Sequence, residues 1–461
     1  MSLALLAGLR APDRSWAQAS QDWLSLQGGP GHLGAAPGTE PAPPIDTGAL
    51  WPNDVSPLNR RLSTPVVMGD TAISVAPSRV VGFDASDGDL LWSVSRTPGP
   101  DAVPVVPAAV DPTGGPDGQG VVVVSEGKSA SDSGLVVLDL VTRERLWTAS
   151  AAGPVLGAPT ISEGKAFAAS TDGFVYRINL KTGDSVKLPA SGPLDGVVDT
   201  APSVAAGRVF VISENQPTAR SRLYAIDTDT GAEVWSFSPG RSALGVSSPT
   251  VVDGTVYAGF GDATVRAFDA ANGEAKWTQP VRDFFSPWSS PAFADGELYV
   301  VDAGGGVYAF DGSTGKRHWD FQFPSIITWG APLVIGGYVY VGMDDGTLGA
   351  IDRTTGHLAW RTVFSSGAIG ALTPAGDLLL VPSLGVAGGI APMSHADGEL
   401  LDVHSPTELK LPVALLNFAA AFVVVLAILL GLFGLVGRSR PPDRQAPDEA
   451  SGGSDEADEG E

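Results

Sequence analysis

The sequence predicts an all-β protein, an eight-bladed β-propeller of four-stranded blades, followed by one C-terminal transmembrane helix. Three observations predict it. A motif that begins with Asp and ends with Trp recurs along the chain, a Pro that opens an apolar stretch recurs independently, and one long uncharged stretch lies near the C-terminus. Repeats of about 40 residues are typical of propellers, in which each repeat is one small sheet.

The recurring motif places a Gly four residues after the Asp and a Trp eight residues after it, except that Arg143 takes the place of Gly in the copy that begins at Asp139. Asp accepts backbone hydrogen bonds in a tight turn, Gly supplies the positive φ that the turn requires, and Trp on the following outer strand would lie between blades. Such a Trp buries about 150–250 Å², or roughly 4–6 kcal/mol gross. The motif residues are Asp84, Trp92, Asp139, Trp147, Asp227, Trp235, Asp269, Trp277, Asp311, Trp319, Asp352 and Trp360.

Two degenerate copies complete the series. Asn179–Lys187 keeps Gly183 but has neither the Asp nor the Trp, and the last copy has Ser394 in the place of Asp and Gly398 in the place of Gly. The second mark, a Pro ahead of an apolar strand, recurs at Pro65, Pro107, Pro159, Pro202, Pro249, Pro291, Pro332 and Pro374. Because the two marks agree in number, we expect eight blades within residues 22–404.

A propeller closes when the two ends of the chain contribute to one blade, which removes open sheet edges. Trp51 precedes the first recurring Pro by 14 residues, as a motif Trp precedes the next Pro elsewhere. We therefore expect residues 48–54 to supply the outer strand of the last blade. The alternative outer strand is Glu399–Val403.

Charge and composition exclude several function classes. The formal net charge is -23, and a surface this acidic repels nucleic-acid backbones. The chain has no Cys, which excludes disulfides, thiolate metal sites and Cys nucleophiles. The five His stand singly, without metal-ligand spacing, and no catalytic motif is present. The residues themselves therefore predict neither a catalytic group nor a metal site.

The Asp–Gly–Trp repeats, together with Asp22-Trp23, Gly28 and Gly34 ahead of them, resemble the tryptophan-docking motifs of the PQQ-like, or quinoprotein-type, β-propeller repeat family. This family includes quinoprotein dehydrogenases and the outer-membrane barrel-assembly propeller lipoprotein. The resemblance covers roughly residues 22–403 and speaks to fold more than to activity. For the dehydrogenases it implies PQQ and calcium as cofactors, with vicinal cysteines against the quinone that this chain lacks.

The uncharged stretch Leu411–Val436 has 26 residues. As a helix it would span about 39 Å, enough to cross a hydrocarbon core of about 30 Å. Three arginines follow it closely, so the positive-inside rule places the C-terminus in the cytoplasm and the propeller outside. Residues 405–410 are then a linker, and residues 437–461 have the composition of an acidic disordered tail.

An exported propeller needs a leader. Residues 1–21 contain a short apolar run and an Ala17-x-Ala19 pattern that resembles a cleavage site, so they are a candidate for an incomplete leader. We expect a single-pass cell-membrane protein with its propeller outside. The alternative is a tail-anchored protein with a cytoplasmic propeller.

The segments that join one blade to the next supply the candidate binding residues. These segments converge on one face of a propeller, and aromatic residues beside Arg are typical of binding patches. The candidates are Arg241, Arg282, Phe284, Phe285, Trp288, Phe323 and Trp329. The alternative is that these side chains only pack under their own loops.

The sequence therefore favours a membrane-tethered, non-catalytic scaffold that binds protein partners through one propeller face. Two alternatives stay open. One is a PQQ-dependent oxidoreductase, and the other is the ligand-sensing domain of a membrane complex.

Overall fold

The computed structural model describes residues 25–29, 31–36, 62–96, 105–129, 132–155, 157–240, 245–283, 289–327, 330–363, 367–376, 378–383 and 389–394. The chain divides into two units, residues 1–404 and 405–461, and all the described residues belong to the first. These residues form an all-β fold in which only two short 3-10 helices occur, η1 (Leu26–Gly28) and η3 (Gln216–Thr218).

The described strands form eight sheets, and the consecutive strands of each sheet are antiparallel neighbours. The four sheets nearest the N-terminus contain four strands each. Their strands are β2 (Val66–Met68), β3 (Thr71–Val75), β4 (Arg79–Asp84) and β5 (Leu90–Ser95); β6 (Ala109–Asp111), β7 (Val121–Ser129), β8 (Asp132–Asp139) and β9 (Arg145–Ala151); β10 (Thr160–Ser162), β11 (Lys165–Ala169), β12 (Val175–Asn179) and β13 (Ser185–Leu188); and β14 (Ser203–Ala205), β15 (Arg208–Asn215), β16 (Arg220–Asp227) and β17 (Glu233–Phe237).

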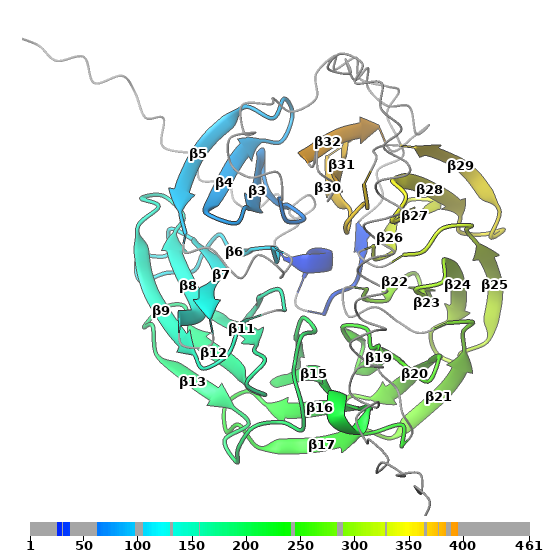
Figure 1. The fold of residues 1–461 in the computed structure, drawn as a ribbon, viewed down its shortest axis with the longest axis horizontal. Helices are drawn as coiled ribbons and strands as arrows, with labels where there is room; N and C mark the ends of the chain where they lie inside the picture. Colours follow the sequence, from blue (N-terminus) through cyan, green and yellow to red (C-terminus); the bar gives the residue numbers. More distant parts are fainter. Residues whose placement is uncertain are drawn as a thin grey trace, which may run out of the picture. The chain divides into compact units, whose positions relative to one another are not determined.

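The remaining sheets repeat this pattern, with a strand added to one of them and three described strands in the last. Their strands are β18 (Thr250–Val252), β19 (Thr255–Phe260), β20 (Thr264–Asp269) and β21 (Ala275–Pro280); β22 (Ala292–Ala294), β23 (Glu297–Val301), β24 (Gly306–Asp311) and β25 (Arg317–Gln322); β1 (Ala35–Ala36), β26 (Leu333–Ile335), β27 (Tyr338–Gly342), β28 (Thr347–Asp352) and β29 (Leu358–Val363); and β30 (Thr373–Ala375), β31 (Leu378–Ser383) and β32 (Gly389–Ser394). Figure 1 shows the sheets standing around a common centre, which confirms the predicted β-propeller.

The first strand of each sheet lies nearest the centre, where it contacts the first strands of neighbouring sheets. Hydroxyl groups beside the recurring prolines link these strands. Thr250 Oγ1 donates to Pro291 O at 2.6 Å, and Thr373 Oγ1 donates to Pro65 O at 2.7 Å. The second bond joins the sheet of β30 to the sheet of β2, so it ties the last described sheet to the first.

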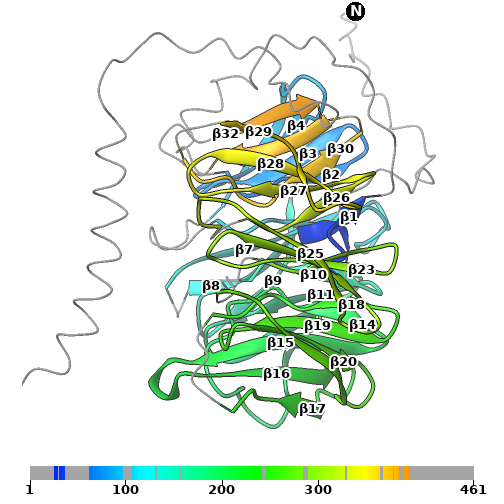
Figure 2. The ribbon, with the colours of Figure 1, turned by 90° about the vertical axis from the view of Figure 1, so that its right-hand side faces the viewer.

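The centre of the ring is filled by residues 25–29 and 31–36, which we call the axial segment (Figure 1). The side view shows η1 and β1 lying between the sheets (Figure 2). Backbone carbonyls of this segment accept hydrogen bonds from the first strands of three successive sheets, from Val251 N at 2.8 Å, Phe293 N at 2.6 Å and Val334 N at 2.9 Å. Its last residues pair in parallel with β26.

The recurring Trp side chains lie between sheets. Trp277 on β21 is 8% exposed, and its Nε1 donates to Gly312 O of the next sheet at 2.9 Å. Gly315 lies directly under the indole with a φ of +72°, and a Cβ there would approach the ring to 2.6 Å. Asp311 Oδ1 accepts the amides and hydroxyls of Ser313 and Thr314 in the same turn. The turn thus presents a flat, rigid seat for the indole.

Two copies that depart from the motif place a cation over an aromatic ring. Arg143 takes the place of the motif Gly, adopts a φ of +65°, and stacks its guanidinium over the Trp92 ring at 4.3 Å. Lys187 takes the place of a motif Trp, and its ammonium lies over the Phe174 ring at 5.2 Å. A cation over an aromatic face is attractive. Arg143 thus keeps the contact with the indole of the preceding sheet, whereas the contact of Lys187 lies within its own sheet.

Several of the elements predicted from the sequence lie outside the residues that the structure describes. Trp51, residues 48–54, Glu399–Val403 and Leu411–Val436 all lie outside the described residues. Within the part of the chain that the structure describes, no helix is long and apolar enough to cross a membrane.

Candidate binding face

One face of the ring carries two kinds of connection. Because neighbouring strands are antiparallel, the turn between the second and third strands of a sheet lies on the same side as the segment that leads to the next sheet. We call this side the connection face. The Asp–Gly turns that seat the Trp side chains lie on the opposite face.

Two of the predicted binding residues lie within the described part of this face. Arg282 is bound to the neighbouring outer strand, with Nη2 2.5 Å from Asp320 Oδ2 and Nη1 3.0 Å from Gln322 Oε1. Phe323 is only 2% exposed and packs edge-on against Phe321 with ring centroids 4.8 Å apart. The other predicted residues lie outside the described residues: Arg241, Phe284, Phe285, Trp288 and Trp329.

The exposure of the two described candidates differs from what a shared binding patch would need. The Arg282 side chain is 53% exposed, but its charge is balanced by Asp320 in a surface ion pair. Such pairs contribute little to stability. Phe323 belongs to the core between sheets, as the packing alternative anticipates for this residue.

A buried polar pair fills the connection-face end of the β22–β25 sheet. Tyr308 on β24 donates its hydroxyl to Asp302 Oδ2 at 2.7 Å and accepts from Arg282 N at 2.9 Å. Asp302 is 1% exposed, and its other oxygen accepts from Gly306 N at 2.8 Å. Burial, reinforced by the hydrogen bond to Asp302, raises the pKa of the Tyr308 hydroxyl. The polar atoms of Tyr308 and Asp302 therefore have hydrogen-bond partners within the propeller, and we assign the pair a structural role.

Equivalent positions in other sheets hold similar pairs. Tyr176 donates to Asp172 Oδ2 at 2.6 Å in the β10–β13 sheet, and Arg266 bonds Asp262 Oδ2 at the same place in the β18–β21 sheet. The connection-face ends of these sheets are therefore closed by a side chain of the third strand that bonds an acid of the preceding turn.

The β26–β29 sheet departs from this pattern. The backbone bond from Met343 N to Thr347 O matches the bond from Asp302 N to Gly306 O, so Met343 stands where the neighbouring sheet has Asp302. By the same register, Gly349 stands where that sheet has Tyr308. Neither member of the polar pair is present. The ring of Phe323 leans into the space, and a Cβ on Gly349 would meet its Cζ at 2.5 Å.

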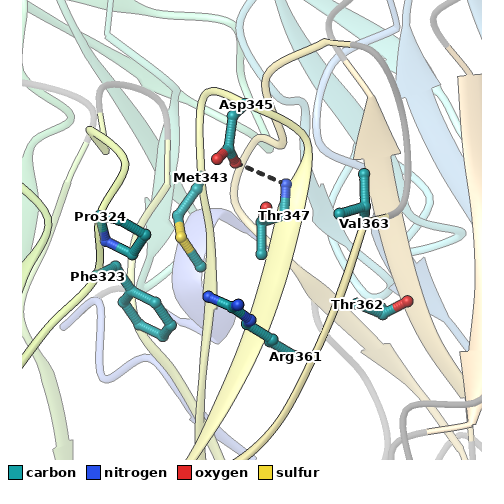
Figure 3. Close-up of a pocket in the computed structure, with 8 residues that line it drawn as sticks. All are labelled: Phe323, Pro324, Met343, Asp345, Thr347, Arg361, Thr362 and Val363. Atoms are coloured by element: carbon teal, nitrogen blue, oxygen red, sulfur yellow. Dashed lines mark hydrogen bonds between the residues drawn. The ribbon is translucent and has the colours of Figure 1, made fainter.

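Phe323 leaves part of that space open as a pocket of about 260 Å³. Figure 3 shows it between the segment after β25, the β27–β28 turn and the end of β29. The lining residues are Phe323, Pro324, Met343, Asp345, Thr347, Arg361, Thr362 and Val363. The sequence analysis names Phe323 but does not predict the pocket. The aligned repeats do indicate the pocket, because Gly349 stands where the preceding repeat has Tyr308.

A second group of buried acids lies at the end of β15. Glu214 is 7% exposed, and its Oε1 accepts from Gly245 N at 2.5 Å. Burial, and then the nearby Asp199 carboxylate, raise the pKa of Glu214 to about 7, and burial also raises the pKa of Asp199. This pair can hold a proton near neutral pH. No metal-ligand cluster accompanies it among the described residues.

The residues do not fit the cofactors that the resemblance implies. The chain has no Cys to place against a quinone, and within the described ranges no group of three or more His, Asp or Glu could hold a metal ion. The axial segment occupies the centre of the ring, where His32 is fully buried and bonds Thr160 and Ser203.

The repeated sheets, the seated Trp side chains and the closed centre define a β-propeller of the PQQ-like repeat class. A family model described as outer membrane protein assembly factor BamB matches residues 78–186, 187–325 and 307–428, which is more than half of the chain. The chain belongs to this family. Comparison with curated proteins gives no match.

Solved structures share the fold at low sequence identity. BamB from Moraxella catarrhalis is 21% identical with a TM-score of 0.52, over 72% of this chain and 95% of that chain. A europium-containing methanol dehydrogenase is 15% identical with a TM-score of 0.58, over 80% and 90%. The quinohaemoprotein alcohol dehydrogenase ADHIIG from Pseudomonas putida HK5 is 14% identical with a TM-score of 0.61, over 85% and 83%. At these identities the likeness concerns the fold alone.

Proposed function

We propose that this protein is a non-catalytic scaffold whose protein partners bind the connection face. The observation that carries the proposal is a pair of exposed apolar side chains on that face. Ile326, in the segment between β25 and β26, is 56% exposed, and Val363, at the end of β29, is 70% exposed. Val363 lines the pocket formed around Phe323, and the carbonyl of Ile326 accepts a hydrogen bond from Asp344 N in the β27–β28 turn, next to the pocket residue Asp345. Exposed apolar side chains that cluster beside a concave site are typical of protein contacts.

The use of charged groups on this face supports a binding role. Arg282, Asp302 and Asp262 each form a hydrogen bond or an ion pair with another side chain of the propeller. A catalytic acid or base would need a free lone pair or proton directed at a substrate. Membership of the BamB family is consistent with an assembly role. Such a role requires surfaces that contact other proteins and no catalytic reaction.

The proposal includes a membrane tether and a side of the membrane. Leu411–Val436 is the proposed single span, and the arginines that follow it favour a cytoplasmic C-terminus with the propeller outside. We also infer that the eight sheets are the blades of a complete propeller and that residues 48–54 close the last one. A protease added to intact cells should degrade the propeller but spare an epitope placed after residue 437. Protection of the propeller would favour the tail-anchored alternative.

Site-specific photo-crosslinking tests the partner face. A photoreactive residue in place of Val363, in the full chain in its own membrane, should form discrete crosslinked species. Val141 offers a matched control because it is 58% exposed but lies in the turn from Asp139 to Arg143, on the opposite face. Ile326→Glu should abolish the products from position 363, since it adds a charge beside the proposed contact. Equal products from positions 363 and 141 would refute the proposal.

A further inference from the structure

The pocket of the β26–β29 sheet has an Arg positioned over a missing side chain. Arg361 on β29 is the cross-strand partner of Gly349 on β28, just as Asp320 is the partner of Tyr308 in the preceding sheet. Because Gly349 has no side chain, nothing on β28 covers the space next to the guanidinium. Figure 3 shows the Arg361 side chain directed toward Phe323 and Met343.

The inner wall of this pocket is apolar and rigid. Met343 is fully buried and Phe323 is 2% exposed, so each presents only part of its surface to the pocket. Pro324 and Val363 extend the apolar lining toward solvent. A volume of about 260 Å³ has room for a short aliphatic or aromatic group and leaves a large ligand outside.

Arg361 is chemically available. No side-chain hydrogen bond or ion pair joins it to another described residue. By contrast, Arg282 and Arg266 on nearby sheets, and Arg353 in the β28–β29 turn of the same sheet, each bond a carboxylate. In a chain with a net charge of -23, an Arg without an acidic partner at the edge of an apolar pocket is a ready anion site. The guanidinium binds a planar carboxylate through two parallel hydrogen bonds.

Asp345 limits which anions can enter. It lines the other end of the pocket, and its Oδ1 accepts from Thr347 N at 2.9 Å within its own turn (Figure 3). This bond holds the negative charge at the rim, where it repels a second negative charge on a ligand. The pocket therefore favours a ligand with one carboxylate over a dicarboxylate or a phosphate.

We propose that this pocket binds a short apolar group that bears a single carboxylate. The apolar group lies against Phe323 and Met343, and the carboxylate accepts hydrogen bonds from Arg361. A free monocarboxylic acid and the C-terminal residue of a peptide share this chemistry. The inference goes beyond the scaffold role, because the pocket could bind either ligand whether or not a partner covers Ile326 and Val363.

Calorimetric titration of the full chain in detergent tests the proposal with three probes. They are 4-methylpentanoate, acetyl-Gly-Gly-Leu with a free C-terminus, and the same peptide with an amidated C-terminus. Saturable binding of the first two, with affinity for the amide at least about tenfold weaker, is expected, because hydrogen bonds to a charged group contribute about 1.5–3 kcal/mol. Binding of the acid alone identifies a small-molecule source, and binding of the free peptide alone identifies a peptide terminus. Equal binding of the amide, or no saturation, overturns the proposal.

Variants locate the site. Arg361→Gln should weaken binding of the free acid about tenfold or more, and Arg361→Lys should weaken it less, because the charge remains but the paired hydrogen bonds do not. Arg220→Gln is the matched control, since Arg220 is also exposed and has no hydrogen bond or ion pair to another described residue. Arg361 is exposed, so the melting midpoint of its variants should not change. Equal affinities of the wild type and Arg361→Gln would assign any binding to another site.

Discussion

Single side chains decide which sheet carries a pocket. Tyr308 closes the end of its sheet by bonding Asp302, while Gly349 at the equivalent position leaves a space that only Phe323 partly fills. The decisive position is the second residue of the aligned repeats, Tyr308 in VYAFD and Gly349 in LGAID, and it is visible in the printed sequence. The exposure of Phe323 is not visible there, because it depends on the neighbouring sheet and on the missing Tyr.

Glu214 makes stability depend on pH in a defined direction. Its pKa in the folded state is about 7, above its ordinary value of 4.5, so between these values the folded state holds a proton that the unfolded state has released. This contribution to the free energy of unfolding is therefore present at low pH and lost as the pH rises from 4.5 to 7. The contribution is up to about 3 kcal/mol.

Glu214→Gln should remove that part of the pH dependence. Urea unfolding at pH 5 and pH 8 should show the variant gaining stability relative to the wild type at the higher pH, because its side chain never ionises. Glu233→Gln, at an exposed position on β17, is the control and should not change the slope. A wild-type slope that persists in Glu214→Gln would mean that another group carries it.

At the scale of strands and turns, the sequence is highly informative. The predicted four strands per blade occur, for example, as β18 to β21 in the sheet that contains Asp269 and Trp277, and Asp269 accepts a hydrogen bond from Ala271 N in its turn, as its chemistry requires. These features are local, so spacing and residue type suffice to predict them. Pairings between sheets, such as Arg282 with Asp320, depend on how two blades are aligned, and no local pattern encodes that alignment.

Trp277 tests the contact between neighbouring sheets. Trp277→Ala should lower the free energy of unfolding by about 3–5 kcal/mol, because it leaves a cavity over Gly315 and removes the bond to Gly312 O. Trp277→Phe should cost less, since it keeps most of the apolar area and loses the hydrogen bond. Denaturant titration measures both. An unchanged midpoint in Trp277→Ala would contradict a structural role for the seated indole.

At the scale of the whole molecule, His32 connects the axial segment to two sheets. The hydroxyl of Ser203 donates to Pro249 O, so His32 Nδ1 donates to Ser203 Oγ, at 3.1 Å, and Nε2 accepts from the Thr160 hydroxyl at 3.0 Å. Burial lowers the pKa of His32 to about 4, which keeps the ring neutral. Its stabilising contribution is complete above pH 6.5 and is lost as the pH falls toward 4, opposite in sign to that of Glu214.

His32→Ala should loosen the axial segment before the sheets. The amides of Val251, Phe293 and Val334 donate to carbonyls of this segment, so their hydrogen exchange should become faster in the variant. Amides between β19 and β20 should keep their wild-type rates. Exchange measured by NMR or mass spectrometry separates the two sets, and unchanged rates at all three amides would show that His32 does not hold the segment in place.

The axial segment also constrains the order in which the molecule can assemble. Gln27 bonds Pro332 O, 305 residues further along the chain, so a segment that is synthesised before the sheets completes its bonds only after most of the sheets exist. Contacts this distant in sequence form late and slowly. Until β26 is made, the carbonyl of Gly34 and the residues of β1 lack their partners, so this end of the axial segment must remain solvated and accessible to proteases. A chain that stops short of β26 would therefore keep an unlocked N-terminal strand, and proteolysis there would distinguish unfinished molecules from finished ones.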